Sequence, residues 1–283
     1  MRPQFQHELT TSFMLWADNY ICQRADAFSN FTTSFFANQN DSRLDENLIG
    51  YSSPHKQWVF DESIDGAIVP SGVWNDGEFL ERGEFGLMFD FDNGRALFDK
   101  SFGYEKTRVS GAYSVKDFNF YITNQTEEQL IIESKFDVNS RFRQDFSGIA
   151  PYSQVAPAIF VNPEMSQNTP YAFGGQDKTK TEIRAVVMSQ NSYQLDGALS
   201  VFADSKHEVF SKLGFDDYPL NEVGDAIGFN YRELSELSKS QEPFFLEDVR
   251  VSKLSDRITK KVDPSLFVGF IDFEISNVRY PRS

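Results

Sequence analysis

The residue types that most often carry catalysis or bind metals are scarce in this chain and widely separated. It has three histidines, His7, His55 and His207, and a single cysteine, Cys22, which lies in an apolar stretch. A structural zinc site needs several Cys or His ligands at short spacing, and histidine is the commonest general base. We therefore expect no metal site, no catalytic site and no internal disulfide, and we interpret Cys22 as a small core residue.

Carboxylates are numerous, so closely spaced pairs are expected by chance. A glycosidase needs two carboxyl groups roughly 5–10 Å apart across the sugar. The candidate pairs are Asp61 with Glu62, Asp90 with Asp92, and Asp216 with Asp217. Nothing around any pair distinguishes it from the others. Trp58 and Trp74 are candidate sugar-stacking rings, with core packing as the usual alternative. Together with the carboxylates they give an alternative hypothesis for function, a carbohydrate-binding or carbohydrate-cleaving β-protein involved in host contact.

The segment Asp90–Gly94 begins like the loop of an EF-hand calcium site. Such a loop requires glycine at its sixth position and glutamate at its twelfth, which here are Arg95 and Ser101. Gly174-Gly175 lacks the spacing of a dinucleotide-binding motif, and no phosphate loop ending in Gly-Lys-Ser/Thr occurs. We therefore expect neither a metal nor a cofactor.

The same segment indicates a β-hairpin instead. Apolar and polar residues alternate up to Asp92, and Asn93-Gly94 follows. This dipeptide favours a two-residue turn in which both residues adopt positive φ. With that turn, Asp92 faces Arg95 and Phe89 faces Phe98, which are a sensible charge pair and aromatic pair.

The charge of the chain argues against several kinds of partner. The formal net charge is −15, with a sequence pI near 4.6. A strongly acidic surface repels the nucleic acid backbone and anionic membranes, although it would line a conduit through which DNA passes without specific binding. The start of the chain does not resemble a signal peptide, and its early apolar run is too short to span a membrane. We expect synthesis in a cytoplasm and no membrane partner.

The first 50 residues predict a helix followed by an arm. Apolar residues from Leu9 to Tyr20 recur at the spacing of one helix face, and this pattern ends near Arg24. An aromatic run and then a polar run follow between Ser29 and Asn47, within a predicted long loop over residues 29–57. This combination suggests an arm or long loop, which is free to pack on a neighbouring molecule.

The rest of the chain predicts mainly strands. Alternation over residues 58–138 indicates antiparallel strands, including one from Leu130 to Val138, with a bulge near Lys116-Asp117. Prolines make residues 140–181 a predicted loop-rich segment. A helix is predicted from Leu195 to Leu213, capped by Asn191 or Ser192, then a loop over 214–242 and two closing strands. The expected fold is a single mixed domain (1–283) of the α+β class, mainly antiparallel and sandwich- or barrel-like, with an N-terminal helix and one later helix.

Several segments, taken in order, resemble the virion structural proteins of tailed bacteriophages. They are Phe13–Trp16, Ala27–Asn30, Ile68–Val73, Asp90–Arg95, Ala172–Gly175, Ile183–Val187, Glu247–Ser252, Gly269–Phe273 and Val278–Arg282. The resemblance spans nearly the whole chain, although each motif is short, and it assigns no catalytic residue.

This resemblance implies a non-enzymatic protein that forms an oligomeric ring at the head–tail connector (neck) or tail. Its partners would be further copies of itself and other virion proteins, and it would be located in the virion after assembly in the host cytoplasm. Long loops and open strand edges would become ordered on contact with neighbours. The candidate interface residues are Phe31, Phe35, Phe36, Tyr280 and Arg282.

Overall fold

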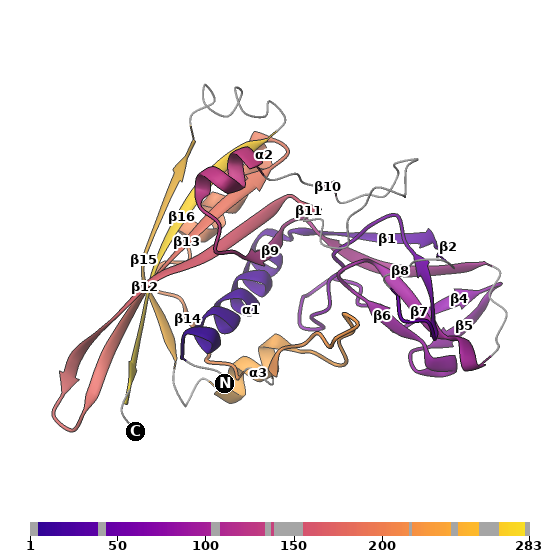
Figure 1. Cartoon of the computed structure of the whole chain (residues 1–283), viewed down its shortest axis with the longest axis horizontal. Coiled ribbons are helices and arrows are strands. Elements are labelled where there is room, and N and C mark those ends of the chain that lie inside the picture. Colours follow the sequence, from indigo (N-terminus) through magenta and orange to yellow (C-terminus); the bar gives the residue numbers. More distant parts are fainter. Residues whose placement is uncertain are drawn as a thin grey trace.

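A computed structural model shows a six-stranded sheet and two four-stranded sheets on opposite sides of a long helix (Figure 1). It describes residues 5–38, 44–102, 108–133, 137–138, 155–214, 217–238, 243–254 and 266–280. The fold is α+β with mostly antiparallel strands, as predicted.

Three α-helices and three short helical turns are present in these ranges. They are α1 (Phe5–Ala25), α2 (Ser192–Ala203), α3 (Tyr231–Ser238), the 3-10 turns η1 (Glu84–Gly86) and η2 (Lys100–Phe102), and the π-helical turn η3 (Gln129–Glu133). The predicted N-terminal helix is α1 and the predicted later helix is α2. In α2 the Asn191 side chain accepts a hydrogen bond from the Gln194 N–H at 2.8 Å, which confirms the predicted cap.

The largest sheet has the strand order β14-β15-β16-β13-β12-β9. Its strands are β9 (Asn119–Ile122), β12 (Ala158–Ala172), β13 (Gln176–Ser189), β14 (Val209–Phe210), β15 (Phe244–Lys253) and β16 (Phe267–Arg279). All neighbours are antiparallel except β9 and β12. Helices α1 and α2 cover one face. Gly269 of β16 lets α2 approach closely, because a Cβ there would lie 2.9 Å from Leu195.

The two smaller sheets form a lobe that we call the 28–116 lobe. One has the order β1-β8-β4-β5 and the other β2-β3-β7-β6. Their strands are β1 (Phe28–Ser34), β2 (Phe36–Asn38), β3 (Leu48–Ser52), β4 (Gly72–Asn75), β5 (Glu78–Glu81), β6 (Met88–Asp90), β7 (Arg95–Asp99) and β8 (Val109–Lys116). The core between them is aromatic: Trp58 stacks on Tyr113 at 4.4 Å between ring centroids, and Phe35 packs against both. Elsewhere, β10 (Asp137–Val138) pairs with β11 (Val155–Ala156).

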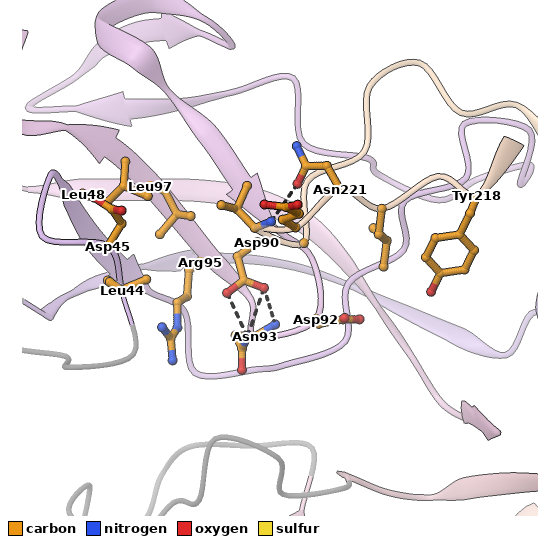
Figure 2. A pocket seen from close by; sticks show the side chains of 14 residues that line it. Leu44, Asp45, Leu48, Asp90, Asp92, Asn93, Arg95, Leu97, Tyr218 and Asn221 are labelled. Atoms are coloured by element: carbon orange, nitrogen blue, oxygen red, sulfur yellow. Dashed lines mark hydrogen bonds between the residues drawn. The ribbon is translucent and has the colours of Figure 1, made fainter. Parts of the chain in front are cut away.

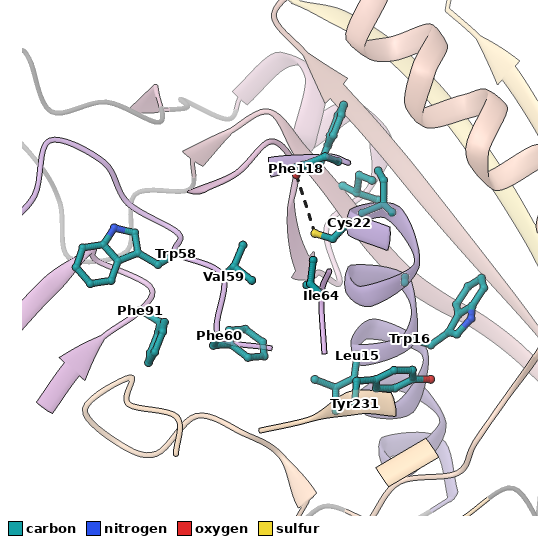
Figure 3. Close-up of a cluster of buried hydrophobic side chains, with 14 of the residues drawn as sticks. Leu15, Trp16, Cys22, Trp58, Val59, Phe60, Ile64, Phe91, Phe118 and Tyr231 are labelled. Carbon is teal, nitrogen blue, oxygen red and sulfur yellow. Dashed lines mark hydrogen bonds between the residues drawn. The ribbon is translucent and has the colours of Figure 1, made fainter. Parts of the chain in front are cut away.

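Helix α1 joins the lobe to the large sheet because it is buried on both sides. Figure 3 shows Leu15 and Cys22 on the side that faces the lobe and Trp16 on the opposite side. Trp16 stacks on Phe210 of β14 at 5.3 Å between centroids. Cys22 is buried in the core, as predicted. The result is one hydrophobic cluster that runs from the large sheet through α1 into the lobe.

The hairpin at Asn93-Gly94 is present, but its predicted register is wrong. Asp90 pairs with Arg95, and Phe89 with Ala96, so the connection has four residues rather than two. Gly94 has a positive φ of 64°, whereas Asn93 does not. The Asp90 carboxylate accepts hydrogen bonds from the Asn93 N–H and side chain, which stabilises this longer turn.

Other local predictions are corrected by the tertiary structure. The phase change near Lys116-Asp117 is not a bulge, because β8 and β9 belong to different sheets. Residues 129–133 form η3 rather than the start of a strand. The predicted loop over 29–57 contains β1, β2 and β3, and most of the described part of 140–181 belongs to β12 and β13. The helix predicted to reach Leu213 ends at Ala203, and α3 lies within the predicted loop 214–242.

Candidate assembly surface

The most prominent feature of the surface is the β12–β13 hairpin, which projects well beyond the body of the molecule (Figure 1). The two strands pair from Ala158↔Met188 to Ala172↔Gln176. Every β12 residue from Glu164 to Ala172 is exposed. Because an isolated two-stranded ribbon is marginally stable in water, the support that β16 gives along β13, as far as Asp177↔Arg279, is important for holding this arm in place.

The arm is tied to the N-terminal part of α1. The Ser166 hydroxyl donates to the Gln6 side chain at 2.8 Å and lies at the same distance from the Thr181 hydroxyl. The Arg279 guanidinium lies 3.8 Å from the centre of the Phe5 ring, which is a cation–π contact. These contacts lie on the helix-covered side of the sheet, so they orient the arm relative to the core.

The opposite face of the arm base carries alternating charges. Lys178 contacts Glu247, and Lys180 contacts both Glu247 and Glu274. Burial favours the protonated form of Glu247, but hydrogen bonds from Lys178, Ser276 and Lys180 outweigh it and lower its pKa to about 2. Neighbouring strands are thus cross-linked by charge where the sheet leaves the body.

The tip of the arm is aromatic and exposed. Gly174 and Gly175 make the turn with φ values of 111° and 90°, a region that favours glycine. Phe173 is fully exposed and Tyr171 is 62% exposed. Large apolar side chains on an extended arm are a common feature of protein contact sites.

The predicted interface residues have different positions. Phe35 is buried (8% exposed), and Phe31 stacks on His55 at 4.1 Å between centroids, so both rings pack within the chain. Phe36 and Tyr280 are exposed, at 55% and 53%. Tyr280 follows β16, whose last residue, Arg279, pairs with Asp177 close to the tip of the arm. Phe36 lies on β2 in the 28–116 lobe. Arg282 lies outside the described residues.

A cleft of about 590 Å³ lies between the β6–β7 hairpin and the loop 218–224. Figure 2 shows that the Asp90 carboxylate points back into its own turn, toward Asn93, rather than outward. Surrounding protein and the nearby charge of Asp90 raise the pKa of Asp92 to about 6, although its side chain reaches solvent. No group of three or more His, Cys, Asp and Glu side chains is arranged for a metal ion among the described residues.

The other candidate chemical groups are separated. The His55 ring lies 2.9 Å from the Tyr113 hydroxyl, and burial lowers its pKa. His7 is on α1 and His207 is near β14, so the structure does not bring the histidines together. Trp58 is buried in the core. Trp74 is partly exposed and packs on Phe79, at 4.9 Å between ring centroids.

Asp61, one of the nominated carboxylates, is buried and accepts hydrogen bonds from Asn19, Ser63 and the Tyr231 N–H. It therefore joins α1 to the start of α3. Its partner in the nominated pair, Glu62, is exposed. In the third pair, Asp217 accepts from the Gly214 N–H, and Asp216 lies outside the described residues.

Comparison with protein-family models and with curated proteins finds no match to this chain. Among the described residues, no helix has the length and apolar character needed to cross a membrane. The fold itself defines the class: an α+β protein of mostly antiparallel sheets. Its prominent surface feature is the exposed β12–β13 arm.

Proposed function

We propose that this chain is a non-enzymatic structural protein that forms an oligomeric ring, at the head–tail connector or tail of a tailed bacteriophage. The observation that carries the assembly part of the proposal is the β12–β13 arm. An exposed aromatic tip on a strand ribbon is costly to leave in water but useful in a contact with another subunit. The phage part rests on the sequence resemblance described above.

In this proposal the arm contacts neighbouring subunits while the body supplies a rigid base. Contacts from α1 and the charge network around Glu247 fix the direction of the arm, and pre-organisation reduces the entropy lost on association. The net charge of −15 would allow DNA to pass through such a ring without binding to its wall.

The arm tip provides a direct test. Multi-angle light scattering at several protein concentrations measures the molar mass of the wild type and of the double variant Tyr171→Ser/Phe173→Ser. We expect the wild type to form oligomers and the variant to dissociate at concentrations at which the wild type stays assembled. The matched control is Tyr193→Ser, because Tyr193 is 87% exposed but lies on α2. A wild type that remains monomeric at every concentration and with purified virion proteins would contradict the proposal.

The exposed Trp74–Phe79 pair supports a second candidate function, carbohydrate binding. These two rings lie at neighbouring positions on β4 and β5, and exposed aromatic rings can stack on sugars. A glycan array tests this possibility. Binding that is lost in Trp74→Ala and kept in Tyr193→Ser would favour it, and absence of binding to any glycan would reject it.

A further inference from the structure

We propose that copies of this chain join head to tail by pairing the outer edge of β12 in one copy with the outer edge of β15 in the next. This inference rests on the assembly function proposed above and specifies its interface. Within the described part of the chain, each of these strands has a stretch with no neighbouring strand on its outer side. Such stretches are templates for pairing with another chain.

The two open stretches lie at opposite ends of the sheet. β9 covers β12 only at Ala158–Val161, which leaves the part toward the arm tip open. The outer edge of β15 is covered at Phe244–Leu246, by β14 and by His207 and Glu208, which exchange backbone hydrogen bonds with Leu246. This is the end of β15 nearer the arm. The open part of β15 is therefore its far end, up to Lys253. A neighbour shifted along the strand direction can pair without its β14 meeting β9.

Strand direction also fits a second copy. β12 and β15 run in opposite directions, because three antiparallel pairings separate them. A second copy related by a shift with a small rotation would therefore present its β15 antiparallel to β12. Contacts of this head-to-tail kind form a ring when the rotation closes, and sheet twist supplies a rotation between neighbouring strands.

Backbone alternation identifies which β15 groups face outward. The Leu254 N–H donates to the Val268 carbonyl of β16, so the backbone N–H and C=O of Leu254 point toward β16. Because successive residues of a strand alternate, Val249, Val251 and Lys253 direct their N–H and C=O groups away from the sheet.

On β12, too, hydrogen bonds show which backbone groups point away from the sheet. The Thr123 N–H donates to the Val161 carbonyl, so the backbone groups of Val161 point away from β13. Pro163, two residues further on, has the same orientation because successive residues of a strand alternate. The β12–β13 register shifts at a bulge between Pro163 and Met165. Beyond this bulge, Thr169 pairs with Lys178 and its hydroxyl donates to the Lys178 carbonyl, which places Pro170 on the outer edge. Both prolines thus lie where no ladder hydrogen bond is lost, and they limit pairing to the segment between them. In that segment the backbone N–H and C=O groups of Ser166 and Asn168 point outward, away from β13.

One register matches these two segments. Placing Gln167 of one copy opposite Arg250 of the next puts Ser166 opposite Val251 and Asn168 opposite Val249. All four backbones face the new interface. Glu164, which is the only charged residue of β12, then lies near Lys253 of the next copy.

Cysteine cross-linking tests this register. Gln167 and Arg250 are exposed, and Cys22 is buried. In the proposed pairing their Cα atoms are roughly 4.5–5.5 Å apart, within the range for a disulfide. Mixing Gln167→Cys with Arg250→Cys under mild oxidation should yield a disulfide-linked dimer that neither variant forms alone. The double variant Gln167→Cys/Arg250→Cys carries a cysteine at both edges and should yield disulfide-linked oligomers larger than a dimer.

The control is Ser71→Cys, at an exposed position of the 28–116 lobe, which should not cross-link with Gln167→Cys. Thermal unfolding of each variant checks that it is folded. Equal cross-linking with the control, or no cross-linking in a protein that light scattering shows to be oligomeric, would overturn this inference and leave the assembly proposal standing. Cross-linking of Gln167→Cys to a different virion protein would also overturn it, whereas a monomeric wild type would contradict both.

Discussion

Lys116 of β8 and Asp18 of α1 form an ion pair at 2.6 Å, buried between the 28–116 lobe and the long helix. The Lys116 ammonium also lies 4.1 Å from the centre of the Phe60 ring. Because Lys116 contacts both Asp18 of α1 and Phe60 of the lobe, it fixes how α1 meets the lobe. The same helix orients the arm through Gln6 and Phe5, so this pair links the lobe to the proposed assembly surface.

Removing one partner of this pair should be strongly destabilising. We expect Lys116→Met to lower the free energy of unfolding by about 3–5 kcal/mol, because an uncompensated carboxylate stays buried. Urea denaturation measures the change. The double variant Asp18→Leu/Lys116→Met should recover part of the loss. Arg24→Met, which removes a surface ion pair with Glu208 at 3.5 Å, should change stability by less than about 1 kcal/mol. Similar effects of Lys116→Met and Arg24→Met would contradict the assigned role.

The turn at Gly94 should not tolerate a side chain. A Cβ at this position would collide with the His55 carbonyl oxygen and would lie 2.9 Å from the Trp58 indole nitrogen, in addition to the strain at φ 64°. We expect Gly94→Ala to destabilise the protein by more than about 2 kcal/mol in chemical denaturation. Gly77→Ala is the matched control. Gly77 also has positive φ but has open space around it, so only the backbone cost of about 1 kcal/mol is expected. Equal losses would show that the close approach is unimportant.

Acid should weaken the arm base through Glu247. Its folded-state pKa is lowered from 4.5 to about 2, so the native state favours the ionised form. The resulting stabilisation is fully present above the unfolded-state pKa and is lost as the pH falls from about 4.5 toward 2. After allowance for partial solvent screening, we expect about 1–2 kcal/mol. Glu247→Gln should remove this part of the pH dependence in urea titrations, and Glu222→Gln, at an exposed site in the cleft loop, should not. An unchanged acid profile in Glu247→Gln would contradict the charge network.

Asp92 should show the opposite dependence. Its folded-state pKa is raised from 3.8 to about 6, so the native state favours the protonated form, and folding is progressively opposed as the pH rises from about 4 through 6. Asp92→Asn should therefore raise the melting temperature at pH 7.5 relative to the wild type and have little effect at pH 4. NMR titration of the carboxyl carbon measures the pKa directly. A midpoint near 4 would show that the cleft does not perturb this group.

The elements that could be predicted from the sequence are those whose buried apolar residues recur at the regular spacing of a helix or a strand. α1 was found from its apolar stripe, although its second buried face, which meets the lobe, could be recognised only in the tertiary structure. The end of α2 was misplaced because Val209 and Leu213 continue the helical phase. The turn that stops the helix includes His207, at φ 73°, which no glycine or proline marks in the sequence.

The candidate assembly surface was largely missed, for a physical reason. The outer half of β12 is exposed and lacks alternation, and Pro163 and Pro170 suggest a loop. Only the partner strand reveals that both prolines lie on the open edge, where a missing N–H has no cost in the sheet. Strand β1 was missed in a similar way, because its mostly polar sequence, FSNFTTS, pairs with β8 at the margin of a sheet. The predicted aromatic contacts Phe31 and Phe35 instead fill the lobe between strands.

The most direct test of the assembly function is electron microscopy of phage particles that carry this protein, combined with mass spectrometry of the purified virions. We expect the protein in the virion as a ring of identical subunits at the neck or along the tail, with the β12–β13 arm of each subunit against its neighbour. Absence of the protein from purified virions, or a single isolated copy with its arm free in solvent, would contradict the account.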